Sequence, residues 1–448
     1  MAKPEKNQEA VYDAAALGKP KMLVLGLQHL FAMFGATVLV PAITGLNVST
    51  TLLFAGLGTL LFHLITGGRV PAFLGSSFAF LGGYAAIAPT ADAAGNALDN
   101  SGLLPYACAG VVVAGLVYLV LAGLFRIFGA KKVMRFFPPI VTGPIIICIG
   151  LTLAGTAITS CTANWLVALV AICTVVICNI WGKGMIKIVP ILLGVVASYL
   201  VAMVADPAAR ANVAATVAAA DWIGLPVIWE NTAFAIFGEG FDGGLLLTSI
   251  ITIAPIALAT MVEHVGDICA ISSTVGKNYV ADPGLHRTLI GDGLATAVAS
   301  LFGAPANTTY GENTGVLALS KVYDPKVVRL AAVFAMVLSF CPKFAALIVA
   351  MPTATMGGVS IVLYGMISAV GVRNVVENQV DFTKSRNVLI AALIMGLAVG
   401  VKYYDPSGAI SFSIGAVTIS LSGLAVAAIV GIVMNAILPG KDYEFSAQ

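Results

Sequence analysis

Long apolar runs separated by short polar segments are the dominant pattern along this chain. The runs are about 17–25 residues long, which is the length a helix needs to cross the hydrocarbon core of a bilayer. They recur along the whole sequence, and a single large soluble core would not produce that spacing. The pattern predicts an all-α polytopic membrane protein with about fourteen transmembrane segments. We place the segments at residues 22–44, 51–67, 71–89, 103–128, 136–156, 163–181, 186–205, 243–268, 285–303, 304–322, 325–344, 351–372, 385–403 and 411–437.

The third and tenth of these segments are the weakest as helices. VPAFLGSSFAF (70–80) and APANTTYGENTG (304–315) mix Pro, Gly, Ser, Thr and Asn at a depth where the chain must cross the membrane. Such backbone is tolerated only where it faces protein or a cavity. Interrupted segments at matching positions of two halves point to a substrate site. We therefore predict that these two segments line a binding site, with a kinked packing helix as the alternative.

Short matches between the two halves of the chain suggest an internal repeat. Pro138 and Gly143 have the same five-residue spacing as Pro352 and Gly357, in what would be the fifth and twelfth segments. A repeat with an odd number of spans must return in the opposite orientation, a common design of secondary transporters. The expectation is two inverted repeats of seven segments each.

Composition supports a chain surrounded by lipid. Apolar residues make up 59% of the sequence and charged residues 10%, where a soluble domain carries about 25% charged residues. The net charge is only +2 and no basic tract points to nucleic acid, so we expect no nucleic-acid partner. The seven cysteines are scattered through apolar runs without metal-ligand spacing, so we expect no metal site.

The distribution of Lys and Arg predicts the orientation. With the N-terminus inside, twenty of the 23 basic residues fall on the inner side, and only Arg210, Lys343 and Lys402 fall outside. We therefore expect a protein of the cell (inner) membrane with cytoplasmic tails at 1–21 and 438–448. The polar stretch 206–242 becomes an outer loop, which we interpret as a solvated connector.

Four acidic residues lie within apolar segments, namely Glu263, Asp267, Asp292 and Glu312. A buried acid costs several kcal/mol unless it is paired or neutralised, so such residues are candidates for function. Glu263 and Asp267 are four residues apart and share one helix face. Two close carboxylates oppose each other's ionisation, which makes the pair a candidate proton carrier. A solvated end position is the alternative for Asp267, and Asp292 fits a structural or water-facing role equally well.

The remaining polar residues narrow the substrate class. No Lys or Arg lies in the middle of a predicted segment, as a site for a bare anion would require. The acidic, amide-rich segments suit a neutral ligand with several N–H donors, or a cation. His264 lies about 100° around the helix from Glu263 and is expected to face away. His29 is expected to have a structural role, with a hydrogen bond across helices possible.

At these residues the sequence resembles the nucleobase–ascorbate transporter family, and within it the bacterial uracil permeases. The similarity extends from about residue 20 to about residue 435. It rests on QHLFAMFGATVLVP (28–41), PAFLGSSFAF (71–80), EHVGD (263–267), DPGLHR (282–287), NTTYGENTGV (307–316) and MGGVSIVLYG (356–365).

The resemblance implies two domains that are each built from both halves of the chain. A core domain would comprise 22–128 and 243–324 together with the segment 325–344, and a gate domain would comprise 129–205 and 345–437. The third and tenth segments would each contain a short strand with the nucleobase between them. The resemblance also implies a homodimer formed through the gate domains.

The resemblance also assigns roles to individual positions. Glu263 and Glu312 would hydrogen-bond the base, and the backbone amides of Phe78 and Gly311 would meet its carbonyl oxygens. Tyr310, Tyr364 and Ser77 would complete the substrate site.

Uracil offers two N–H donors and two carbonyl acceptors, which carboxylates and backbone amides complement. Purine carriers of the family tend to have Gln or Asn where this chain has Glu312, so Glu312 favours uracil. Asp267 stands where some uracil permeases have a histidine, which leaves its part in proton coupling open.

Together these features predict a proton-coupled uracil symporter that works by alternating access, and not an enzyme. No catalytic residue or cofactor is implied, and sodium is an alternative coupling ion. A xanthine or purine permease of the same family is the alternative function, followed by an anion exchanger with the same fold.

Overall fold

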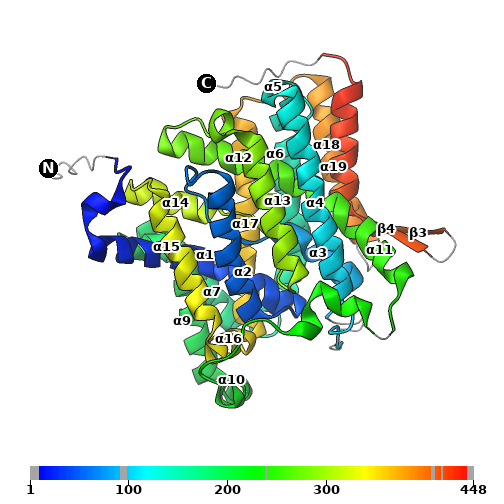
Figure 1. Cartoon of the computed structure of the whole chain (residues 1–448). Helices are drawn as coiled ribbons and strands as arrows, with labels where there is room; N and C mark the ends of the chain where they lie inside the picture. Colours follow the sequence, from blue (N-terminus) through cyan, green and yellow to red (C-terminus); the bar gives the residue numbers. More distant parts are fainter. Residues whose placement is uncertain (1–9, 91–97, 239, 405–408, 415–416, 441–448) are drawn as a thin grey trace.

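The computed structural model describes residues 10–90, 98–238, 240–404, 409–414 and 417–440 (Figure 1). Parts of both expected tails (1–9 and 441–448) and Glu239 of the expected outer loop lie outside the described residues.

The described chain is mostly helical. Its helices and helical turns are η1 (Ala14–Leu17), α1 (Lys19–Thr44), α2 (Val48–Ile65), η2 (Phe78–Phe80), α3 (Leu81–Ile87), α4 (Leu104–Phe128), α5 (Ala130–Met134), α6 (Pro139–Cys161), α7 (Trp165–Trp181), α8 (Met185–Ile188), α9 (Pro190–Ala205), α10 (Pro207–Ala219), η3 (Trp229–Asn231), η4 (Ala233–Phe237), α11 (Gly243–Ile253), η5 (Ala254–Ile256), α12 (Ala257–Val275), η6 (Val280–Gly284), α13 (Leu285–Leu301), α14 (Gly311–Ser320), α15 (Pro325–Ser339), α16 (Pro342–Val349), α17 (Thr353–Glu377), α18 (Ser385–Tyr404) and α19 (Gly423–Ile437).

Many of these helices are long and apolar enough to cross a membrane. Among the described residues seven helices meet that requirement, or up to nine if each of two bent pairs counts as one span. The bent pairs are α9 with α10, at 112°, and α15 with α16, at 88°. Several other expected segments contain shorter apolar helices, such as α7 and α19. A multi-pass membrane protein is therefore confirmed, and the larger number of spans stays a prediction.

The third and tenth segments are interrupted by short strands, as predicted. β1 (Leu74–Ser76) pairs antiparallel with β2 (Asn307–Thr309), and all six residues are buried. A helical segment follows each strand, η2 and α3 after β1 and α14 after β2. The two interruptions therefore form one two-stranded ribbon inside the bundle.

Side chains from neighbouring helices hydrogen-bond the edges of this ribbon. The Thr59 hydroxyl of α2 accepts from the Leu74 amide at 2.9 Å. On the other strand, the Thr296 hydroxyl of α13 donates to the Asn307 carbonyl at 2.8 Å, and the Asn307 side chain donates to the Phe54 carbonyl at 3.1 Å. Unpaired backbone groups are costly where water is absent. These side chains therefore make a strand ribbon possible within a helical membrane protein.

The long helices pack in two sets, and the ribbon packs against helices of the first set. α4 packs on α13, and α2 packs on both α13 and α15, next to α1. In the other set α6 packs along α17 and α18, while α7 contacts α9 and α17. The first set comes from the expected core domain and the second from the expected gate domain.

Glycines allow α6 and α17 to approach closely. A Cβ at Gly143 would meet the Val375 side chain, and one at Gly357 would meet the backbone of Ser160 and Cys161. Pro138 and Pro352 are the N-cap residues of these two helices. The matching Pro and Gly positions noted in the sequence thus occupy matching places in two helices that pack together.

Two regions differ from the sequence-based expectations. The stretch 206–242 is not only a connector, because α10 forms within it, capped by Asp206, whose side chain accepts from the amides of Ala208 and Ala209. The expected segment 411–437 is a helix only from Gly423. Before it, β3 (Ala409–Ile414) pairs antiparallel with β4 (Val417–Ser422). The runs AISFSI and VTISLS alternate apolar and small polar residues, which is the period of a strand.

Candidate functional site

Tyr310 joins the two strands of the ribbon through its side chain. It follows β2 and is the N-cap of α14, and its hydroxyl donates to the Ser76 carbonyl at 2.9 Å. The Thr37 hydroxyl of α1 donates to the Tyr310 hydroxyl oxygen at 3.2 Å. Gly75 makes this contact possible, because a Cβ there would lie 2.5 Å from both Thr37 Oγ1 and the Tyr310 ring. Tyr310 therefore braces the ribbon and is nearly fully buried.

Phe78 and Tyr364 meet beside the ribbon. Their ring centroids are 5.6 Å apart with an interplanar angle of 79°, an edge-to-face arrangement. Phe78 begins η2, whereas Tyr364 lies within α17, so the contact joins the two sets of helices. Ser77 is buried, and its hydroxyl has no hydrogen-bond partner among the described residues, although its amide donates to the Ala306 carbonyl. Three predicted site residues thus lie in neighbouring positions.

The start of α14 presents free backbone donors and an acid. The first amides of a helix have no intrahelical carbonyl partner. No side chain caps α14, and Glu312 lies in its first turn. Gly311 is exposed, and a Cβ there would meet nothing within 4 Å. Open space therefore borders Gly311, and Glu312 beside it is partly exposed.

Two of the four predicted acids, Glu263 and Asp267, lie on the adjoining helix, α12. Glu263 is partly exposed and lies within electrostatic range of Asp267, Asp292 and Glu312. Asp267 Oδ2 accepts from the Thr309 hydroxyl of β2 at 2.7 Å. Asp267 is therefore bonded to the ribbon, and the alternative of a merely solvated position is wrong.

A buried contact between His264 and Asp292 was not predicted. His264 Nδ1 lies 3.2 Å from Asp292 Oδ2, and both side chains have no exposed surface. Thr309 Oγ1 also lies 3.5 Å from His264 Nδ1, so the contact continues to the ribbon. The water-facing alternative for Asp292 is wrong. The available signal was the presence of a histidine beside Glu263 in an otherwise apolar helix.

His29 anchors α14 from the opposite side. The Asn313 side-chain amide donates to the His29 carbonyl at 3.0 Å and lies 3.1 Å from His29 Nδ1. The hydrogen bond across helices that the sequence suggested is present. It positions the first turn of α14 against α1.

The described residues contain no group of three or more His, Cys, Asp or Glu side chains that could hold a metal ion. All seven cysteines are free, and three of them are fully buried. The candidate site is thus composed of carboxylates, amides, hydroxyls and aromatic rings.

Known structures share the fold. The transmembrane domain of a cyanobacterium bicarbonate transporter, BicA, superimposes with a TM-score of 0.61 at 15% identity, covering 95% of this chain and 99% of that one. SLC26A9 superimposes with a TM-score of 0.62 at 12% identity, covering 95% of this chain and 66% of that one. At these identities the likeness shows the architecture alone.

Sequence comparison identifies the family. Residues 20–407 match the model described as "Permease family". The uracil permease of Bacillus caldolyticus is 41% identical over 428 residues, covering 94% of this chain and 92% of the relative. The probable uracil permease of Haemophilus influenzae is 39% identical, covering 95% and 96%. The uracil permease of Escherichia coli (strain K12) is 37% identical, covering 92% and 90%. The chain is therefore a transporter that belongs to the nucleobase–ascorbate transporter family.

Proposed function

We propose that the chain is a proton-coupled uracil symporter that imports the base by alternating access. Several relatives that align over most of the chain are named uracil permeases. The proposed setting is the cell (inner) membrane, with both termini in the cytoplasm. The proposed substrate is uracil or a closely related nucleobase.

The observation that carries this proposal is the arrangement of acids and free amides around the ribbon. Glu312 lies in the first turn of α14, and Glu263 lies on α12, which packs against α14 and β2. Carboxylates accept from the two N–H groups of uracil, and the amides of Phe78 and Gly311 donate to its carbonyl oxygens in this proposal. Phe78 and Tyr364 supply aromatic surface for the ring.

Proton coupling is proposed for Glu263 with Asp267. Both lie on α12, four positions apart, and Asp267 is bonded to Thr309 beside the substrate segment. A proton taken up from outside reduces the repulsion among the carboxylates and favours binding of a neutral base. Loss of that proton inside weakens binding and releases the base. Sodium is the alternative coupling ion.

Movement of a core domain against a gate domain is proposed to switch access. The core comprises 22–128 and 243–344, and the gate comprises 129–205 and 345–437. Phe78 and Tyr364 would meet across this boundary, and Gly357 with Gly358 would set the packing of the gate helices. A homodimer through the gate domains completes the proposal.

Uptake into proteoliposomes tests the function directly. We expect a pH gradient, alkaline inside, to drive accumulation of labelled uracil, and excess unlabelled uracil to compete while xanthine does not. Accumulation driven only by a sodium gradient would show that sodium, and not the proton, is the coupling ion. Stronger competition by xanthine would reassign the substrate, and bicarbonate exchange without uracil uptake would reject the proposal in favour of an anion exchanger.

A further inference from the structure

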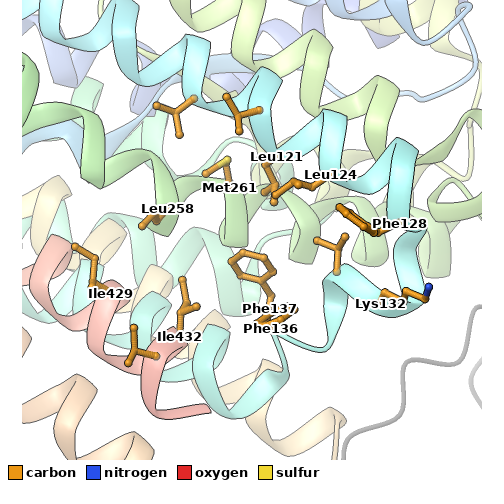
Figure 2. Close-up of a pocket in the computed structure, with 14 residues that line it drawn as sticks. Leu121, Leu124, Phe128, Lys132, Phe136, Phe137, Leu258, Met261, Ile429 and Ile432 are labelled. Atoms are coloured by element: carbon orange, nitrogen blue, oxygen red, sulfur yellow. The ribbon is translucent and has the colours of Figure 1, made fainter. Parts of the chain in front are cut away.

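A deep apolar groove lies outside the candidate site, between helices from both ends of the chain. Its volume is about 640 Å³, and Figure 2 shows its walls. Leu121 and Leu124 come from α4, Leu258 and Met261 from α12, and Ile429 and Ile432 from α19. Phe136 and Phe137, in the segment that connects α4 to α6, contribute a further wall.

Several large apolar side chains that line this groove are exposed. Leu124, Phe128 and Ile429 are 40%, 53% and 37% exposed, although each is a large apolar side chain. α4 is long and apolar enough to span the membrane. Contiguous apolar surface of this kind is stable only against hydrocarbon or another protein. The groove volume of about 640 Å³ leaves room for a flexible hydrocarbon chain.

One end of the groove is basic. Lys132 lines it beside Phe128, at the opposite end from Ile429 (Figure 2). Arg126, Lys131 and Arg135 are exposed in the same stretch of chain. None of these four cations has a carboxylate within salt-bridge distance in the part of the chain that the structure describes.

A few basic residues elsewhere in the described chain do have such partners. Arg69 pairs with Asp282, and Lys326 lies 3.1 Å from Asp13. Arg373 pairs with Glu377 at 2.6 Å. What distinguishes Arg126, Lys131, Lys132 and Arg135 is that four exposed cations lie within ten residues of one another at the end of an apolar groove, where an anionic headgroup could reach them.

We propose that this groove binds one anionic phospholipid, with an acyl chain between α4, α12 and α19 and its phosphate beside Lys132. Basic pockets between membrane helices at the cytoplasmic side recognise anionic headgroups in this way. Charge-assisted hydrogen bonds from Lys and Arg to phosphate supply the headgroup contact. A soluble anion would leave the apolar part unfilled, and a zwitterionic lipid would bring its own headgroup cation next to the four basic side chains.

Bound lipid would influence movement as well as stability. α4 and α12 belong to the proposed core domain, whereas α19 belongs to the proposed gate domain. A lipid between them contacts both, so its presence changes how easily the two slide. This consequence rests on the proposed transport cycle, whereas lipid binding itself does not.

Native mass spectrometry of the detergent-purified full chain tests the binding. We expect phosphatidylglycerol to remain bound at tenfold lower concentration than phosphatidylcholine, and K131Q/K132Q/R135Q to remove that difference. K183Q/K187Q, which changes two exposed lysines between α7 and α9, is the matched control and should retain it. Equal retention of both lipids by the unmodified chain, or an unchanged preference in the triple variant, would overturn the proposal.

A second variant tests the apolar part without changing charge. Leu124→Trp fills the groove from an exposed position, so the fold is preserved, and we expect at least a fivefold loss of phosphatidylglycerol retention. Soluble glycerol phosphate should not compete with the lipid, and competition would indicate an anion site alone. If Leu124→Trp instead leaves lipid retention intact and changes the oligomeric state, a second copy covers the groove and the lipid assignment is wrong. Lipid retention is measured without substrate, so failure of uracil uptake would not affect this result.

Discussion

The two strand–helix segments share a backbone design and differ in chemistry. β1 with η2 and α3 is buried from Leu74 to Leu81 and contains no acid. β2 with α14 continues into accessible residues, beginning with Gly311 and Glu312. The β1 segment therefore supplies aromatic and hydroxyl groups within the packed interior, and the β2 segment places the Glu312 carboxylate where it is partly exposed. The same strand–helix geometry thus presents two different kinds of side chain.

The anchoring of the two segments differs in the same sense. β1 is held by Thr59 and by the Ser76 hydroxyl, which donates to the Thr37 carbonyl at 2.9 Å. β2 and α14 are held by ionisable neighbours, because Asp267 bonds Thr309 and His29 contacts Asn313. The second segment is thus the one held by titratable side chains.

Glu263→Gln should have the largest effect, because it removes the ionisable side chain that is proposed to carry the coupled proton. Accumulation of uracil driven by a pH gradient should be abolished, and binding measured at equilibrium should weaken as well, because Glu263 is also proposed to accept a hydrogen bond from the base. Uptake into proteoliposomes with and without the gradient measures this. Normal gradient-driven accumulation in the variant would separate Glu263 from proton coupling.

Glu312→Gln should weaken uracil binding strongly, since it replaces an acceptor oxygen with a donor. Hydrogen bonds to charged groups contribute about 1.5–3 kcal/mol, so we expect a loss of about 10–100-fold in affinity. Ser77→Ala, in the buried segment, is the matched control and should change affinity by less than about fivefold, because a neutral hydrogen bond contributes about 1 kcal/mol or less. Calorimetric titration measures both, and equal effects would remove the proposed contrast between the two segments.

Gly75→Ala should destabilise the ribbon from the buried side. The added methyl group meets Thr37 and the Tyr310 ring, and such overpacking costs about 1–3 kcal/mol. Gly315→Ala, on α14 where a Cβ meets nothing within 4 Å, is the control and should be neutral or slightly stabilising. Thermal unfolding of the detergent-purified variants gives the comparison. A lower melting temperature for Gly315→Ala than for Gly75→Ala would contradict it.

Tyr310→Phe should have the smallest effect of the four. It removes the hydroxyl that bonds Ser76 and Thr37, and one such hydrogen bond contributes about 1 kcal/mol. Thr37→Val removes the partner, and the double variant should cost less than the sum because the two groups share one bond. Additive losses in thermal unfolding would show that Tyr310 does not brace the ribbon through this bond.

The sequence carried strong local signals for part of this arrangement. Pro, Gly, Ser and Asn within apolar runs indicated the two interruptions, and the isolated Glu263 and Glu312 indicated the acidic site. These features follow from the cost of polar groups in a membrane, which is a property of each segment alone. The interrupted segments and the apolar helices could therefore be predicted from the order of residues within each segment.

Other features depend on how distant segments turn toward each other. The approach of His264 to Asp292 depends on the rotations of α12 and α13, and the role of the Tyr310 hydroxyl depends on its register against Ser76, 234 residues away. The β3–β4 hairpin was missed for a different reason. Over the length of a membrane span its mean hydropathy is that of an apolar helix, and this conceals the alternation of Ser and Thr with apolar residues that is typical of a strand.

The hydroxyl groups along the ribbon have a consequence for redesign of substrate preference. Thr59 and Thr296 bond backbone atoms of the strands, and neither depends on which side chains the following helices present. Residues in the first turn of α14 can therefore be substituted while the β1–β2 ribbon keeps its backbone hydrogen bonds. A library restricted to that turn and to Tyr364 should yield folded carriers at high frequency, whereas one that includes the two threonines should mostly yield unstable protein.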